Sequence, residues 1–135
     1  MITNAPPNPS NPDPIHLIKM LLNGGTIALV GGLPRQPHIT RLADAFDLKD
    51  VLWVSMRESD PSSRRFSSVV LKPELVLVVA LHGLLRHQHK HDLRALCRQC
   101  EVPLLAYWRS PHPAGLADAI ISQHLIKPIR DRRGG

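Results

Sequence analysis

The sequence predicts an α/β fold: a doubly wound, mostly parallel four-stranded sheet with helices on both faces and the strand order 2-1-3-4. Short apolar runs alternate with amphipathic runs of helical length along most of the chain, which is typical of strands joined by crossover helices. The apolar runs are continuous, as in strands that are covered on both faces. Right-handed crossovers then place helices on each side of the sheet.

The first half of the domain contains two of the four strands. Ile15–Leu22 reads as a helix that Asn23 and two glycines end, because glycine readily adopts the left-handed conformation after a helix. Thr26–Val30 and Val51–Met56 are the first two strands, and the helix between them covers His38–Asp47. Its apolar residues follow the helical spacing i, i+3, i+4, i+7 and are Ile39, Leu42, Ala43 and Phe46.

The second half repeats the pattern. A helix is expected to start at Asp60–Pro61, with Asp as N-cap and Pro in the first turn, and to end before Pro73. The remaining strands are Leu75–Leu81 and Pro103–Trp108, and the remaining helices are Leu84–Cys100 and Gly115–Leu125. The predicted core consists of Ile27, Leu29, Leu42, Phe46, Leu52, Val54, Val70, Val76, Val78, Ala80, Leu96, Leu104, Ala106 and Ile120.

Length and composition predict one domain, residues 15–126, between a Pro-rich arm (1–14) and a basic tail (127–135). Of the 135 residues, 43% are hydrophobic and 21% are charged, which is the balance of a globular domain. No apolar run reaches the ~18–20 residues of a membrane span, so no membrane partner is expected. The arm has no Lys or Arg and no apolar segment of the signal-peptide type, which favours the cytoplasm.

Three stretches resemble a known family. They are a strand that runs into Gly-Gly (IALVGGLPRQPHITRLADAF), an apolar strand that ends near a His (LVLVVALHGLLRH), and a helix end that leads into a strand (CEVPLLAYWRS). Together they resemble the small bacterial Rossmann-like family catalogued as domain of unknown function 2325, over roughly Thr26–Ile121. His87 matches the family's His after the third strand. The resemblance implies a Rossmann-like fold and leaves the function open.

Gly31 and Gly32 stand where the first strand turns toward the next helix. In doubly wound sheets, ligands bind at this switch point, and a helix that starts near Gln36–His38 presents N–H groups to anions there. The residues match neither the dinucleotide fingerprint nor the phosphate-binding loop, and Pro34 and Pro37 lack N–H donors. We therefore expect no cofactor. A turn that merely needs two glycines is the alternative.

An arginine follows each predicted strand, and the four are Arg35, Arg57, Arg86 and Arg109. Ser110 and His112 fall in the same loops, which meet at one edge of a parallel sheet. The connections at the opposite edge are more acidic, at Leu48–Asp50, Lys72–Glu74 and Glu101. Because the arginine fork suits phosphate and carboxylate oxygens, these residues, with Gly31 and Gly32, form a candidate anion site. The alternative is that an arginine-rich chain places arginine in every loop.

The histidines and cysteines are weaker candidates for functional residues than the arginines are. His87 and His91 share a helix face, but Arg94 and Arg98 continue it and oppose a metal cation, so no metal is expected. His89 falls nearer the apolar stripe and is expected to be buried and hydrogen-bonded. Two cysteines cannot form a disulfide framework, and at the end of a helix their most natural interpretation is as small hydrophobes, Cys97 and Cys100.

The preferred function is a non-catalytic binding or regulatory module whose basic crevice holds a phosphorylated small molecule or a nucleic acid. The net charge of +6 favours an anionic partner. The alternative is a small phosphoester hydrolase or transferase that uses His82 or His87 as its acid–base group. The basic tail, Lys127–Gly135, is expected to be solvated or to contact nucleic acid. Apolar residues on Ile15–Leu22 favour a homodimer contact.

Overall fold

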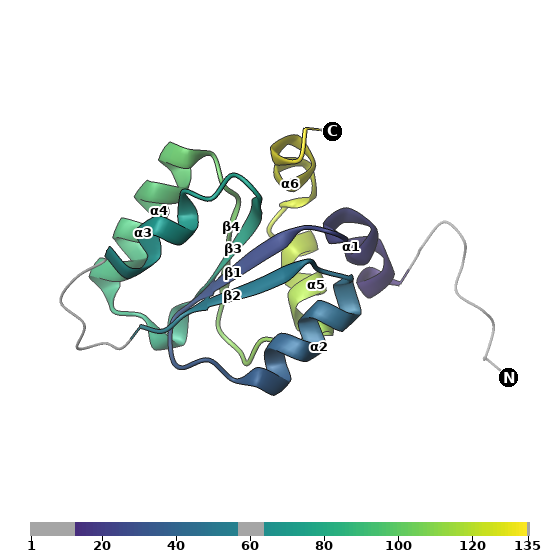
Figure 1. The fold of residues 1–135 in the computed structure, drawn as a ribbon, viewed down its shortest axis with the longest axis horizontal. Coiled ribbons are helices and arrows are strands. Elements are labelled where there is room, and N and C mark those ends of the chain that lie inside the picture. Colours follow the sequence, from purple (N-terminus) through teal and green to yellow (C-terminus); the bar gives the residue numbers. More distant parts are fainter. Residues whose placement is uncertain (1–12, 57–63, 135) are drawn as a thin grey trace, which may run out of the picture.

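A central parallel sheet organises the protein (Figure 1). In the computed structural model, which describes residues 13–56 and 64–134, four strands pair in the order β2-β1-β3-β4, all parallel. This confirms the predicted α/β class and strand order. The strands are β1 (Thr26–Val30), β2 (Asp50–Val54), β3 (Leu75–Leu81) and β4 (Leu104–Tyr107).

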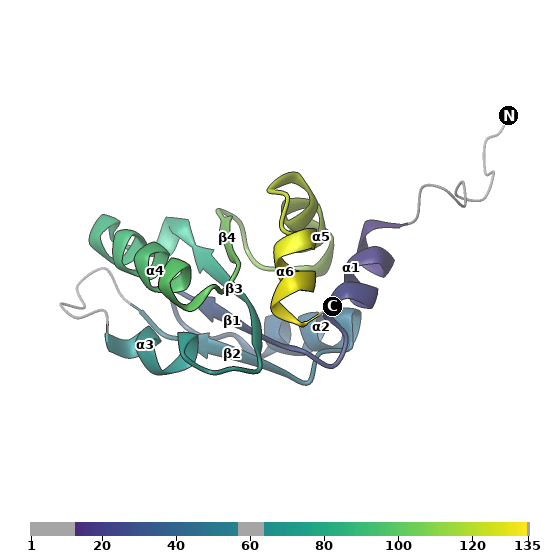
Figure 2. The ribbon, with the colours of Figure 1, turned by 90° about the horizontal axis from the view of Figure 1, so that it is seen from above.

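Helices cover both faces of the sheet, as predicted (Figure 2). One face carries α3 (Arg64–Val70) and α4 (His87–Cys100). The other carries α1 (Pro14–Leu22), α2 (Gln36–Phe46), α5 (Pro113–Ser122) and α6 (Ile126–Arg132). The start predicted for α3, Asp60–Pro61, lies outside the described residues, as do residues 1–12 of the arm.

The two inner strands explain the continuous apolar runs. Every residue of β1 and β3 is buried, since each strand has a neighbour on both sides and helices above and below. The edge strands β2 and β4 are only partly buried. Ten residues of the predicted core are therefore buried, whereas four are only half-buried because they lie on edge strands or at the margin of α4: Leu52, Leu96, Leu104 and Ala106.

The free edge of β4 is blocked by one side chain. The Gln123 amide pairs with Ala106 as a neighbouring strand would: it accepts from the Ala106 N–H at 3.1 Å and donates to the Ala106 carbonyl at 2.7 Å. An edge strand with unpaired backbone groups invites further pairing. This bridge fixes the end of β4, from which the aromatic residues of the site project.

Several predicted boundaries are wrong; the helix predicted over Gly115–Leu125, for example, spans Pro113–Ser122. The helix predicted from Leu84 begins at His87: a short 3-10 helix, η1 (His82–Leu84), comes first, and Leu85 and Arg86 are extended because Leu85 turns into the core. The strand β2 ends at Val54, and Met56 instead forms an isolated antiparallel bridge with Gly32.

The prediction of a solvated tail is also wrong for residues 127–132, because these residues belong to α6. Ile129 is fully buried in the core. Arg132 donates to the carbonyls of Leu75 at 2.9 Å and Cys100 at 3.1 Å, and Arg133 donates to that of Leu21 at 2.7 Å. Guanidinium groups thus satisfy carbonyls at the ends of other elements, and the basic residues become part of the fold.

The helix α1 packs mainly inward. Asp13 caps it by accepting from the Ile15 N–H at 3.1 Å, and Ile18 and Leu22 are buried in the chain's own core. Met20 remains exposed, so the homodimer contact stays a prediction. Among the described residues, no helix has both the length and the apolar character needed to cross a membrane.

Candidate functional site

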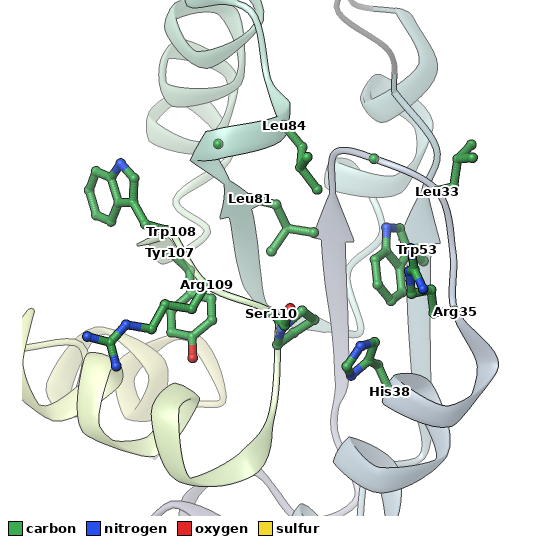
Figure 3. A pocket seen from close by; sticks show the side chains of 13 residues that line it. Leu33, Arg35, His38, Trp53, Leu81, Leu84, Tyr107, Trp108, Arg109 and Ser110 are labelled. Atoms are coloured by element: carbon green, nitrogen blue, oxygen red, sulfur yellow. The ribbon is translucent and has the colours of Figure 1, made fainter.

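A cavity of about 550 Å³ opens at the carboxyl edge of the sheet, where the parallel strands end (Figure 3). It lies across the ends of β1 and β3, the pair at which the strand order reverses, and ligands of doubly wound sheets bind at such switch points. We call it the switch-point pocket. Its walls include Gly32 and Leu33 after β1, Leu81 at the end of β3 and Leu84 in η1, and Tyr107 and Trp108 at the end of β4.

Gly32 lines the pocket, whereas Gly31 does not and forms the turn directly before it. Their φ angles are +125° and +66°, and a Cβ on Gly31 would lie 3.2 Å from Leu81 Cβ, so this turn requires glycine. Their amides donate to the carbonyls of Val54 at 3.1 Å and Met56 at 2.9 Å. These two residues therefore supply the turn and the space, while their N–H groups are already used.

Aromatic rings form much of the pocket wall. The indole of Trp53 is fixed because its Nε1–H donates to the Gly31 carbonyl at 2.8 Å. The His38 ring lies tilted beside it, 6.4 Å away between ring centroids. On the other side, Trp108 is 66% exposed, and with Leu33 and Leu84 it makes an exposed apolar rim. Both tryptophans of the chain thus lie at this pocket.

Two exposed arginines line the pocket, Arg35 from the start of α2 and Arg109 after β4. Figure 3 shows them on opposite sides, with Arg109 directed away from Trp53. Neither guanidinium forms a hydrogen bond or ion pair with a residue that the structure describes. Both are therefore free to pair with an anion.

Three of the chain segments that follow strands carry basic residues and no acidic ones. The chain segments Gly31–Arg35, His82–Arg86 and Trp108–His112, which follow β1, β3 and β4, contain no Asp or Glu. Asp50 and Glu74 lie instead at the opposite edge, where β2 and β3 begin. These three segments therefore favour an anion, while the segment after β2 contains Glu58 and Asp60 and the charge of Asp118 acts on Tyr107 in the pocket wall.

The structure brings together only part of the predicted anion site. Gly32, Arg35, Arg109 and Ser110 all line the switch-point pocket. Arg86 is exposed at the start of α4 and does not line it. His112 is the N-cap of α5, where its Nδ1 accepts from the Gly115 N–H at 3.4 Å. Arg57 lies outside the described residues.

Neither candidate acid–base histidine lines the pocket. His82 packs edge-on against Trp108, with ring centroids 4.6 Å apart. Burial lowers the pKa of His82 from its ordinary value, and the charges of Lys90 and Arg94 lower it further. His87 is exposed in the first turn of α4. In residues 13–56 and 64–134, no group of three or more His, Cys, Asp or Glu side chains could hold a metal ion.

Two buried residues of α4 lie away from the pocket. His89 is buried, as predicted, but its expected hydrogen bond is wrong: neither ring nitrogen has a partner among the described residues. Burial, with a smaller effect of Cys100, raises the pKa of the Cys97 thiol to about 12. This agrees with the interpretation of Cys97 as a small hydrophobe.

The sequence prediction did not include His38, Trp53, Tyr107 or Trp108 in the site. Their common feature is position: Tyr107 and Trp108 lie at and just past the end of β4, Trp53 is the last residue but one of β2, and His38 lies in the first turn of the helix after β1. His38 lines the pocket, and its Nδ1 is buried without a partner among the described residues. The sequence feature that could have indicated these site residues is the presence of aromatic residues near the ends of the predicted strands.

Comparison with models of protein families found no match, and comparisons with curated proteins and with solved structures found none either. The resemblance to the domain of unknown function 2325 therefore stays a prediction.

Proposed function

We propose that the protein is a non-catalytic binding module that holds a small phosphorylated molecule with a planar ring, of the nucleotide type, in the switch-point pocket. The observation that carries this proposal is the combination of aromatic walls and two arginines without a partner in the described chain, Arg35 and Arg109, around one cavity at the switch point.

The chemistry of the pocket suits both halves of such a ligand. Stacking of a base on an aromatic side chain contributes about 1–3 kcal/mol, and Trp53 and Trp108 offer such rings. A guanidinium pairs with phosphate oxygens through two parallel hydrogen bonds. The cavity volume of about 550 Å³ falls within the range of about 300–1,000 Å³ that is usual for small ligands.

Binding is favoured over catalysis by the placement of the histidines. A phosphoester hydrolase or transferase of the predicted kind needs His82 or His87 at the reacting group. The walls of the pocket include neither residue. The histidine that does line it, His38, has a ring nitrogen without a partner in the described chain, and its imidazole can form a hydrogen bond with a ligand.

Calorimetric titration with the mono- and diphosphates of the four common nucleosides tests the proposal. Adenosine and ribose 5-phosphate probe the ring and the phosphate separately. We expect Arg35→Ala and Arg109→Ala each to weaken nucleotide binding about ten- to a hundredfold, since a charge-assisted hydrogen bond contributes about 1.5–3 kcal/mol. Trp108→Ala should weaken the binding of adenosine as well as of nucleotides.

The control is Arg41→Ala, which removes an exposed arginine of α2 that does not line the pocket. It should bind as the parent does. Absence of binding by every nucleotide, or equal binding by the parent and the two pocket arginine variants, contradicts the proposal.

A further inference from the structure

The outer flank of α4 carries a row of cations that the pocket does not use. Arg86, Lys90, Arg94 and Arg98 follow one another at a spacing of four residues, so neighbours lie about 5–6 Å apart on a helix surface. We call these four residues the cation row. It extends over about 18 Å of the helix, at ~1.5 Å per residue.

Such a row opposes helix formation. Like charges at i and i+4 destabilise a helix by about 0.2–0.5 kcal/mol per pair, and no cation of the row forms an ion pair within the described part of the chain. The acidic residue on the same helix, Asp92, is half-buried and accepts a hydrogen bond from Gln88 at 2.8 Å. Repulsion along the row is therefore left for an outside partner to relieve.

The middle of the cation row lies near the rim of the switch-point pocket. The charges of Lys90 and Arg94 act on His82, and His82 contacts Trp108, the exposed ring at the rim of the pocket. Figure 3 shows the Trp108 ring projecting away from Trp53 and His38. A path from the pocket outward thus meets an exposed aromatic ring first and a row of cations next.

We propose that the pocket's ligand is one nucleotide of a single-stranded nucleic acid, whose chain leaves over Trp108 and His82 and follows the cation row of α4. This inference rests on the proposed function, because it extends the same site. A ring for stacking beside a basic track is how proteins hold single strands without reading sequence. Single-stranded RNA and single-stranded DNA both offer what this site would recognise, a phosphodiester chain with accessible bases.

The test measures the affinity for an eight-nucleotide single strand, as DNA and as RNA, at 50 and 200 mM salt. The parent is compared with the double variant Lys90→Gln/Arg94→Gln. Arg41→Gln/Lys49→Gln, which changes two exposed cations away from the row, has the same charge change. The same sequence as a duplex, inorganic polyphosphate and a nucleoside monophosphate are titrated in parallel.

We expect the single strand to bind more tightly than the monophosphate, the duplex or polyphosphate. Each phosphate contact contributes about 0.7 to the slope of log affinity against log salt. The variant Lys90→Gln/Arg94→Gln, called the α4 variant, loses two such contacts. When the salt rises from 50 to 200 mM, the factor by which its affinity falls should therefore be about seven times smaller than the factor for the parent. The control variant should keep the slope of the parent, and the α4 variant should bind the monophosphate unchanged.

Two failures are distinguishable. If the monophosphate binds in the pocket but the single strand binds no more tightly and the α4 variant keeps the parent's slope, this inference is wrong and the proposed function stands. If single strands bind through α4 but Trp108→Ala and Arg35→Ala bind every probe as the parent does, the pocket is not the nucleotide site, and both proposals are overturned. Equal affinity for polyphosphate and the single strand also overturns the inference, since it leaves the bases without a role.

Discussion

Gly31 directly follows β1 and packs against Leu81 at the end of β3. Its φ is +125°, and a Cβ at this position would lie 3.2 Å from both the Cβ and the carbonyl oxygen of Leu81, so alanine here meets backbone strain and a crowded wall. We predict that Gly31→Ala lowers the free energy of unfolding by about 1–3 kcal/mol, measured by denaturant titration. Gly83→Ala is the matched control, because a Cβ there meets no atom within 4 Å. Equal destabilisation by the two changes contradicts this role of Gly31.

His82 links pH to stability. Its pKa in the folded protein lies below the ordinary 6.5, through burial and then through Lys90 and Arg94. The unfolded chain therefore binds this proton first as the pH falls, so His82 reduces stability from about pH 6.5 down to its lowered pKa. We predict that the parent loses more unfolding free energy between pH 7.5 and 5.5 than His82→Asn does. Parallel pH profiles of the two proteins contradict the prediction.

Phosphates bound beside Lys90 and Arg94 should offset part of this lowering of the His82 pKa. An anion there offsets the two charges that lower the pKa of His82, so the pKa should rise in the complex. Binding of a single strand should then take up a proton near neutral pH. The His82 ring signals in NMR spectra, followed through a pH titration with and without the oligonucleotide, measure this shift. An unchanged titration midpoint argues against phosphates at the cation row.

At the scale of elements, α6 holds the amino edge of the sheet together. Arg132 donates to three carbonyls, those of Leu75, Cys100 and, at 3.3 Å, Lys72. We predict that Arg132→Ala lowers the free energy of unfolding by about 1.5–3 kcal/mol or more, because a hydrogen bond from a charged donor contributes that much. The exposed Arg130, whose guanidinium makes no such bond within residues 13–56 and 64–134, is the control. A loss for Arg130→Ala as large as for Arg132→Ala contradicts the role of this bridge.

This helix also shows where local sequence patterns stop predicting structure. β1 and β3 have the bounds that their apolar runs predict, since burial of continuous strands decides them. The contacts of α6 are different: Arg132 bonds to a carbonyl 57 positions earlier and Arg133 to one 112 positions earlier. A basic run of this kind looks like a solvated tail until the carbonyls that it meets are known. Deletion of residues 127–135 should therefore destabilise the fold, in addition to any effect on nucleic-acid binding.

The sequence predicts the candidate site only in outline, because the site too depends on contacts between distant parts of the chain. Parallel strands bring their following loops to one edge, so Arg35 and Arg109 could be assigned to a common region from sequence. Which loop residues share one cavity depends on where each short loop turns. Arg86 follows β3 but lies at the start of α4 outside the pocket, whereas Trp53, a residue within β2, lines it. Such placement is set by tertiary packing rather than by the local pattern.

At the scale of the whole molecule, charge and shape coincide at one edge of the sheet. The switch-point pocket, with its aromatic rings and its two arginines, lies at the carboxyl edge, while Asp50, Glu74 and the bridge made by Arg132 lie at the amino edge. The fold supplies the cavity by reversing its strand order, and the loop residues supply the chemistry.

A two-dimensional 1H–15N NMR titration with the nucleoside monophosphate that binds most tightly tests the central claim most directly, because both indole N–H groups of the protein report on the pocket. We predict saturable shifts of the Trp53 and Trp108 indole signals and of the amides around Arg35 and Ser110, with the amides of Asp50 and Glu74 unchanged. Shifts confined to the amino edge, or indole signals that stay fixed while the ligand binds, would contradict the assignment of the switch-point pocket as the ligand site.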